Sequence, residues 1–188
     1  MRIDVVDNGG QWTHKEWRLV RSLGVESTII PNTTEPSELN DVDGLILSGG
    51  APSIVSELDK LGNISNFIED LSIPILGICV GAQFIALHFG GEVGPGKTPE
   101  FGRTTIEMVR HDGIFSSLPE TFTAWENHND EVRKLPESLV LAGSSRNCPV
   151  QAFFHEKRAI YGVQFHPEVH DTQNGLELFS SFVSVCRD

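Results

Sequence analysis

One of the three cysteines lies in a pattern that could turn its sulfur into a nucleophile. Residues 76–83 read LGICVGAQ, so Gly77 and Gly81 flank Cys79 at G-x-C-x-G spacing, between an apolar run and a helical pattern. This is the sulfur form of a nucleophile elbow, a strained strand-to-helix turn that exposes its central side chain. The glycines leave room for the turn. The helix N-terminus would favour a thiolate at Cys79, and the Val80 N–H would face a developing oxyanion.

The competing interpretation of Cys79 is a buried core cysteine, because free cysteine is among the most buried residue types. The flanking glycines and the strand–helix context favour the nucleophile. Cys148 and Cys186 have no such context. Three cysteines at these spacings give no disulfide framework and match no zinc site, so we expect no bound metal.

A thiolate that attacks an acyl group needs a base, and the base needs a group to orient it. Residues 162–168 read GVQFHPE and offer both. On an extended chain, residues i and i+2 point to the same side, so His166 and Glu168 emerge together. Pro167 stiffens the link between them. The sequence therefore predicts His166 as the base of Cys79 and Glu168 as its orienting carboxylate.

A glycine pair follows another apolar run and could supply a second oxyanion donor. Residues 48–53 read SGGAPS, and glycines here allow backbone N–H groups to approach a ligand. The N–H groups of Gly50 and Val80 would then form a two-donor oxyanion hole. The alternative is an ordinary glycine-rich loop.

Two further patterns suggest chemistry but fail their context tests. Residues 91–98, GEVGPGKT, match the phosphate-loop pattern G-x-x-x-x-G-K-[ST] letter for letter. That motif must follow a strand and open a helix, whereas here it follows a helical pattern and Pro99 disfavours helix at Thr98. We interpret it as a turn. His166 and His170 have metal-ligand spacing only on a helix, which Pro167 argues against.

His128 stands in the polar segment 126–131, ENHNDE, which predicts a loop. Such a loop could border a ligand. A solvated loop is the simpler interpretation, and the residues alone leave the choice open.

Apolar runs and helical patterns alternate in the first half of the chain, and strands dominate most of the second. Expected strands cover residues 3–6, 27–30, 44–47, 73–78, 103–109, 139–144, 150–154 and 159–165, the last two forming a hairpin. Expected helices begin at Thr13, where Thr13 and Glu16 match a capping box, and cover 64–71, 81–89 and 175–186. The pattern predicts an α/β fold with three layers, whose open, mostly parallel sheet has an antiparallel extension.

Length and charge narrow the function classes. The chain has 188 residues, 39% of them hydrophobic, which fits one packed domain. Its formal net charge of −12 argues against binding to nucleic acid or to anionic lipid. With no expected leader segment or membrane span, the sequence favours a soluble protein of a reducing, cytoplasmic compartment.

The motifs around Cys79 and His166 together resemble the class I (triad) glutamine amidotransferases, and the likeness covers essentially the whole chain. Further segments resemble the branch of that family that serves GMP synthesis, in its stand-alone form. These segments are VDNGGQ at 6–11, SGGAPS at 48–53, EFG at 100–102, HNDEV at 128–132 and VHDT at 169–172. Departures are modest, such as Val80 and Trp12 where tyrosine is frequent.

The resemblance implies one amidotransferase domain over residues 1–188, with a flavodoxin-like sheet. It implies Cys79 as nucleophile, His166 as base and Glu168 as orienter, with the oxyanion hole at Gly50 and Val80. The residues that it assigns to the glutamine pocket are Gln83, Gly49, His128 and Asn129, the segment around His128 contributing through its backbone.

The implied reaction is hydrolysis of L-glutamine to glutamate and ammonia, without a cofactor in this chain. The implied partner is a separate ATP-pyrophosphatase (synthetase) subunit, which uses ATP and Mg²⁺ to convert XMP to GMP. Three alternatives stay open: a glutaminase subunit of the anthranilate or imidazole glycerol phosphate type, a non-catalytic glutamine-binding module, and a nucleotide-binding enzyme that uses residues 91–98.

Overall fold

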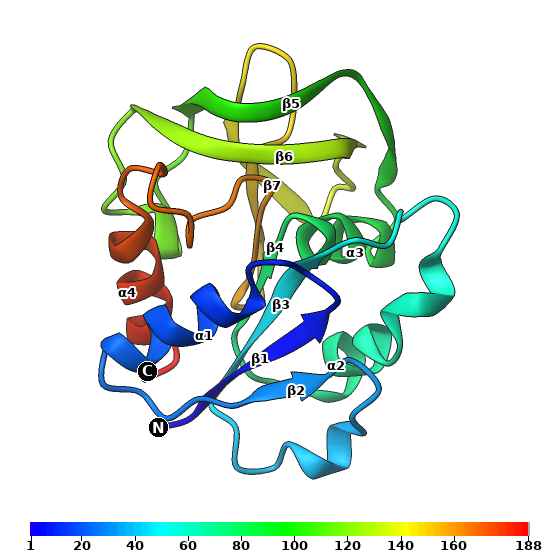
Figure 1. Ribbon diagram of the computed structural model, residues 1–188, viewed down its shortest axis with the longest axis vertical. Helices are drawn as coiled ribbons and strands as arrows, with labels where there is room; N and C mark the ends of the chain where they lie inside the picture. The colour runs from blue at the N-terminus through cyan, green and yellow to red at the C-terminus, as the bar shows by residue number, and fades with distance from the viewer. Residues whose placement is uncertain (188) are drawn as a thin grey trace.

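A single nine-stranded sheet runs through the computed structural model, which describes residues 1–187 (Figure 1). The strand order is β2-β1-β3-β4-β9-β8-β7-β5-β6, so strands from the two ends of the chain meet in the middle. The parallel part holds β1 (Ile3–Asn8), β2 (Ile29–Pro31), β3 (Gly44–Gly50), β4 (Ile75–Ile78) and β9 (Ile160–Val163).

The parallel strands are apolar because helices cover both of their faces. Every residue of β4 and β9 is buried, and so are the first six of the seven residues of β3. Near-continuous apolar runs are typical of such doubly covered strands. The sequence prediction of a parallel sheet in three layers is confirmed here.

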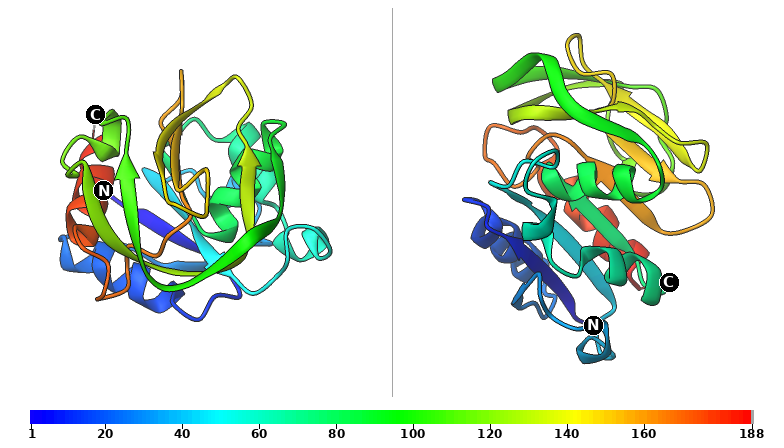
Figure 2. Two further views of the ribbon diagram at one scale, coloured as in Figure 1. Left: turned by 90° about the horizontal axis from the view of Figure 1, so that it is seen from above. Right: turned by 90° about the vertical axis from the view of Figure 1, so that its right-hand side faces the viewer.

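The antiparallel part begins at β9, which pairs with β8 (Ala152–His155) and through it with β7 (Leu139–Ser144). Beyond β7 lies a long ribbon of β5 (Glu92–Met108) and β6 (Thr121–Lys134), paired from Glu92 with Lys134 to Glu107 with Thr121. Figure 2 shows this ribbon arching over the end of the molecule where the parallel strands finish. The ribbon therefore forms a wall beside the carboxyl ends of those strands.

Four α-helices form the outer layers. Helices α1 (Thr13–Ser22) and α4 (Gly175–Val185) pack on one face of the sheet, where Val20 and Phe179 join one buried cluster. Helices α2 (Ile64–Asp70) and α3 (Val80–His88) pack on the other face, where Phe67 and Ile85 join a second cluster. Single 3₁₀ turns cover Pro36–Glu38, Leu58–Leu61 and Gly113–Phe115.

Three sequence predictions are wrong in detail. The segment around His128 is not a loop, because it lies within β6. The phosphate-loop match at 91–98 is not a turn, because residues 92–98 belong to β5; its lack of a following helix agrees with setting that motif aside. The capping box at Thr13 does not form, since Trp12 is the N-cap residue and makes no side-chain cap.

The helices of residues 1–187 are all too short or too polar to span a bilayer.

Candidate active site

Cys79 occupies a strained elbow between β4 and α3. Its backbone has φ 50° and ψ −110°, a positive φ that only Asn174 shares among the non-glycine residues of 1–187. The Cys79 N–H donates to the Val163 carbonyl at 2.8 Å, which anchors the turn to β9. A strained backbone at the centre of a strand–helix turn is the geometry that the G-x-C-x-G pattern predicts.

The flanking glycines are needed because backbone atoms approach them closely. A Cβ on Gly77 would lie 2.7 Å from the Ala82 nitrogen, and one on Gly81 would lie 2.2 Å from the Leu47 carbonyl oxygen. No flexible side chain could move aside to relieve the second contact. The Gly81 position therefore locks α3 onto β3.

Gly81→Ala is expected to destabilise the fold by about 3 kcal/mol, because the new methyl group would force apart two packed backbones. Denaturant unfolding followed by circular dichroism measures the loss. The control is Gly24→Ala. Its Cβ would meet nothing within 4 Å, but the new alanine would have to keep the positive φ of 78° that Gly24 adopts. It should cost only about 1 kcal/mol. Equal stability of the Gly81 variant and the unmodified protein would contradict the close packing.

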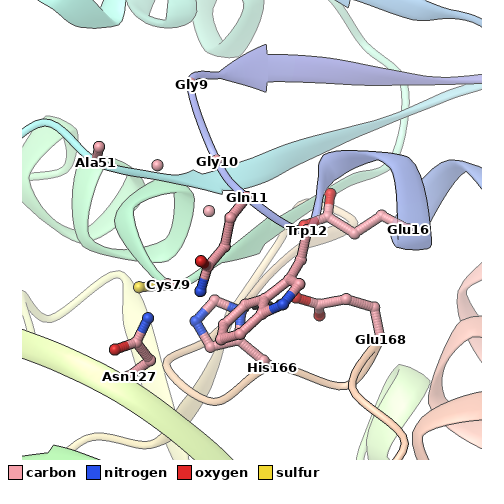
Figure 3. A pocket seen from close by; sticks show the side chains of 12 residues that line it. Gly9, Gly10, Gln11, Trp12, Glu16, Ala51, Cys79, Asn127, His166 and Glu168 are labelled. Carbon is pink, nitrogen blue, oxygen red and sulfur yellow. Dashed lines mark hydrogen bonds and ion pairs between the residues drawn. The ribbon is translucent and has the colours of Figure 1, made fainter.

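Strand β9 brings the second half of the site beside the first. Ile78 of β4 pairs with Val163 of β9, so the residues that follow each strand emerge at the same sheet edge. His166 is anchored there through its N–H, which donates to the Trp125 carbonyl of β6 at 2.9 Å. Cys79 and His166 line one cavity, together with Glu168 (Figure 3).

The His166 ring is held on one side and open on the other. Its Nδ1 lies 2.7 Å from Glu168 Oε1, and both side chains are buried. Its Nε2 has no protein hydrogen-bond partner among residues 1–187. The Trp12 ring packs edge-on against it, with centroids 4.4 Å apart. A ring oriented through Nδ1 with a free Nε2 is the arrangement a general base requires.

Charge at the site favours the protonated imidazole. Burial alone would lower the pKa of His166, but the Glu168 carboxylate and then Cys79 raise it, leaving this pKa well above its usual range. A protonated His166 lining the same hollow as Cys79 can donate a proton to a leaving group there.

The glycine pair lies at the end of β3 rather than in a loop. A Cβ on Gly49 would lie 3.1 Å from His166 Cε1, and one on Gly50 would lie 2.4 Å from the Asn8 carbonyl oxygen. The Ser48 hydroxyl donates to the Gly49 carbonyl at 2.9 Å. That carbonyl and the Gly50 N–H share one trans peptide and point in opposite directions, so the Ser48 contact also fixes the Gly50 N–H. Val80 opens α3, where an N–H has no intrahelical partner.

Two hollows meet at Cys79, of about 250 and 340 Å³. The first also holds His166, Glu168 and Gly49. The second holds the predicted pocket residues Gln83, His128 and Asn129. Both are bordered by Gly50, Ala51, Cys79 and Asn127. Cys79 therefore lies between the hollow of His166 and the hollow of Gln83.

Gln83 is held rigidly at the second hollow. Its Nε2 donates to the Asp130 carbonyl at 2.7 Å and to Gln164 Oε1 at 3.0 Å. Gln164 Nε2 in turn lies 3.6 Å from Cys79 Sγ. This chain of contacts connects the sulfur to strand β6, so Gln83 also supports the wall of the hollow.

The His128 side chain belongs to a buried network instead of a solvated loop. Its Nε2 lies 3.2 Å from Glu100 Oε2 and 3.4 Å from Glu126 Oε2, and its Nδ1 lies 3.1 Å from the Asp130 carbonyl oxygen. Ser145 Oγ and Gln151 Nε2 donate to Glu100 at 2.8 and 2.7 Å. The side chain thus braces β6, while its segment borders the second hollow.

Glu100, His128 and Cys148 bring three possible metal-ligand atoms within 4.8 Å of one another. The Glu100 oxygens accept the hydrogen bonds just described, and the Cys148 thiol donates to the Val150 carbonyl at 3.4 Å. Burial raises the pKa of Cys148 and keeps it a thiol. These contacts describe a hydrogen-bonded structural group.

Several residues of the first hollow were not predicted as site residues from the sequence. Gln11, Trp12 and Glu16 follow the end of β1, and Asn127 lies on β6. Polar residues directly after an apolar strand are a signal that could have indicated the first group, because open α/β sheets place their sites at strand ends. Asn127 could not be recognised in the same way, because the polar segment 126–131 has no alternating apolar pattern that would indicate a strand.

Known proteins resemble this chain over nearly all of its length. A glutamine-hydrolyzing GMP synthase subunit from Thermoplasma acidophilum is 56% identical over 186 residues, covering 99% of this chain and 93% of the relative. The Picrophilus torridus protein of the same name is 51% identical over 187 residues and covers both chains fully.

Solved structures share the fold. A crystal structure of a Thermoplasma acidophilum protein matches with a TM-score of 0.96 at 56% identity, covering 100% of this chain and 94% of that one. A glutamine amidotransferase from Thermotoga maritima matches with a TM-score of 0.77 at 22% identity, covering 90% of this chain and 76% of that one, which shows the fold alone. The profile of the class-I glutamine amidotransferases matches residues 4–186, and the chain belongs to that family.

Proposed function

We propose that this chain hydrolyses L-glutamine to glutamate and ammonia through Cys79, His166 and Glu168. It would pass the ammonia to a separate ATP-pyrophosphatase subunit that converts XMP to GMP. One observation carries the proposal: His166 is paired with Glu168 at 2.7 Å through Nδ1, and its Nε2 is left unpartnered among residues 1–187, in the cavity that the Cys79 elbow borders.

The reaction proceeds by two acyl transfers. The Cys79 thiolate attacks the side-chain carbonyl of glutamine, and the oxyanion is held by the N–H groups of Gly50 and Val80. The tetrahedral adduct collapses as His166 gives its proton to the departing nitrogen, which leaves as ammonia. His166 then takes a proton from water, which attacks the glutamyl thioester and frees glutamate and the thiolate.

The second hollow is the proposed glutamine site. Gln83 and the backbone of His128 and Asn129 border it, and Gly49 borders the first hollow beside the same sulfur. Gln83 holds this wall through its contacts to Asp130 and Gln164. The proposal needs no cofactor or metal in this chain, and it assigns ATP and Mg²⁺ to the partner. The proposed setting is the cytoplasm, where a reducing environment keeps a thiol such as Cys79 free.

Relatives that carry the name of a GMP synthase subunit are 40–56% identical to this chain, and this favours the GMP branch over other amidotransferases. The anthranilate and imidazole glycerol phosphate types would use the same triad with another acceptor. The direct test adds a partner that aminates XMP and looks for GMP made from glutamine. Glutamate release separates the enzyme from a non-catalytic glutamine-binding module: glutamine would slow alkylation of Cys79 in both cases, but only the enzyme would release glutamate.

The isolated chain is expected to be nearly inactive and to switch on when its loaded partner binds. Free hydrolysis would waste glutamine, and ammonia released to water becomes ammonium, a poor nucleophile. Partner contact would favour the competent geometry of the site, a population shift rather than new chemistry. Steady-state glutamate release is measured for the isolated chain, then with the partner, then with partner, ATP, Mg²⁺ and XMP. If the isolated chain runs as fast as the loaded complex, it is a free-standing glutaminase.

A further inference from the structure

Glu16 is a buried carboxyl that the triad mechanism does not use. It lies in the first turn of α1, its exposed fraction is 1%, and it lines the same hollow as Cys79, His166 and Glu168 (Figure 3). It does not cap the helix, because α1 has no side-chain cap. Burying a carboxyl costs free energy unless its oxygens are satisfied or its charge is paired. The position therefore calls for an explanation within the site.

No cation of residues 1–187 pairs with Glu16, and its Oε2 has no hydrogen-bond partner among them. Cys79, His166, Glu168 and Gly49 line the same hollow as Glu16. Glu16 therefore shares one hollow with the triad and with the glycine pair.

Two neighbouring carboxyls in a buried site do not both stay ionised at neutral pH. Glu168 is the one that accepts the short contact from His166 Nδ1, so the negative charge belongs on Glu168 and the proton on Glu16. Burial raises the pKa of Glu16 well above its usual range, and the Glu168 charge raises it further. A neutral Glu16 keeps its carbonyl oxygen as a hydrogen-bond acceptor for a backbone N–H of the hollow.

The Gly49 N–H belongs to the peptide just before the one that carries the proposed oxyanion donor. The following peptide is held at its carbonyl by the Ser48 hydroxyl, at 2.9 Å. A Cβ on Gly10 would lie 2.3 Å from the Gly49 carbonyl oxygen, so backbone also closes that side. The Glu16 carboxyl lies in the same hollow as Gly49, and its Oε2 has no partner among residues 1–187, so it can accept a hydrogen bond from the Gly49 N–H. With that contact, both peptides that precede Gly50 would be held, and the direction of the Gly50 N–H with them.

We propose that Glu16 is a positioning residue of the proposed glutaminase: as a neutral carboxyl it fixes the Gly49–Gly50 backbone for oxyanion binding and leaves the single negative charge beside His166 to Glu168. This inference rests on the proposed function. It assigns Glu16 no contact with the substrate, and it makes the group's neutrality, rather than its charge, the property that matters.

The test compares Glu16→Gln, Glu16→Ala and the exposed control Lys15→Ala, each assayed with the loaded partner complex. The side chain that Glu16→Gln introduces has the shape of the neutral acid and keeps an acceptor for the Gly49 N–H. Glu16→Gln should therefore keep the unmodified kcat at pH 7. Glu16→Ala should lower kcat about tenfold to a hundredfold, less than the full loss of an oxyanion donor, and leave KM for glutamine nearly unchanged. Lys15→Ala should change neither.

The pH dependence of kcat distinguishes this role from a purely structural one, which would leave the pH profile unchanged. As pH rises, ionisation of Glu16 in the unmodified enzyme adds a negative charge near the developing oxyanion, so kcat should fall. Glu16→Gln cannot ionise, so its kcat should persist to higher pH. The proposal is overturned if Glu16→Gln loses as much kcat as Glu16→Ala at pH 7, if Glu16→Ala keeps the unmodified kcat, or if the profiles of the Gln variant and the unmodified enzyme coincide.

A second measurement needs no turnover and separates this inference from the proposed function. The amide ¹H–¹⁵N NMR signals of Gly49 and Gly50 should shift in folded Glu16→Ala and stay near their unmodified positions in Glu16→Gln and Lys15→Ala. Unshifted signals in Glu16→Ala would refute the positioning role even if glutamine proves not to be the substrate. An inactive unmodified complex with the expected NMR pattern would instead refute the proposed function alone.

Discussion

Cys79→Ala is expected to abolish glutamine hydrolysis while leaving the fold intact. The sulfur is the group that forms the acyl intermediate, and removing a nucleophile typically lowers kcat by about 10⁴-fold or more. Alanine is smaller than cysteine and carries no group that the elbow must accommodate, so circular dichroism and the unfolding midpoint should change little. Glutamate release with the loaded partner complex measures the effect.

Cys148 and Cys186 supply matched controls for that substitution. Cys148 is buried and donates to the Val150 carbonyl, and Cys186 lies at the end of α4. Neither lines a hollow at the elbow. Cys148→Ala and Cys186→Ala should keep hydrolysis close to the unmodified rate. Full activity in Cys79→Ala would refute the mechanism, and a loss shared by all three variants would point to a general effect on folding.

His166→Ala is expected to cost nearly as much as the loss of Cys79, because both the activation of the thiol and the protonation of the leaving nitrogen depend on that ring. Glu168→Ala should cost less, since the orienter acts through the base. Burial lowers the pKa of His166, and the Glu168 charge is the strongest influence that raises it. Glu168→Gln should therefore lower that pKa, which an NMR titration of the His166 ring would detect.

The conservative variant provides the control for shape. Glu168→Gln keeps the size of the side chain and a hydrogen-bond acceptor but removes the charge. A kcat order in which Glu168→Ala is worse than His166→Ala would contradict the assigned roles. An unchanged titration of His166 in Glu168→Gln would contradict the electrostatic part of the assignment.

The parallel half of the fold could be predicted from the sequence because local patterns specify it, and the same patterns marked Cys79, His166 and Glu168, which the structure places in one hollow. The run before Cys79, the two glycines and the helix after it each agree with the elbow that forms. The strand at 139–144 was predicted with its observed bounds. The sequence does not explain why residue 81 must be glycine. The structure does, because Gly81 lies close to the carbonyl oxygen of Leu47, a residue distant in sequence.

Strand β6 could not be predicted in the same way, because part of its buried face is polar. Glu126 and His128 are buried, and His128 contacts Glu100 of the neighbouring strand β5, which in turn accepts hydrogen bonds from Ser145 and Gln151. A polar run of this kind indicates a loop unless its partners are known, and those partners lie far away in sequence. The prediction for Glu16 was also wrong: its i+3 spacing from Thr13 suggested a cap, and only the tertiary structure places it in the same hollow as Glu168.

Strand β9 lies at the boundary between the parallel and antiparallel parts of the sheet. The proposed active site can therefore be completed only late in folding. Cys79 stands on the elbow after β4, but His166 arrives only after β9 has paired with β4 on one side and β8 on the other. A chain emerging from the ribosome, or an intermediate with only β1 to β4 paired, would hold a nucleophile without a base. Under the proposed mechanism an incomplete molecule lacks its general base, so glutamine hydrolysis requires that the two ends of the chain have come together.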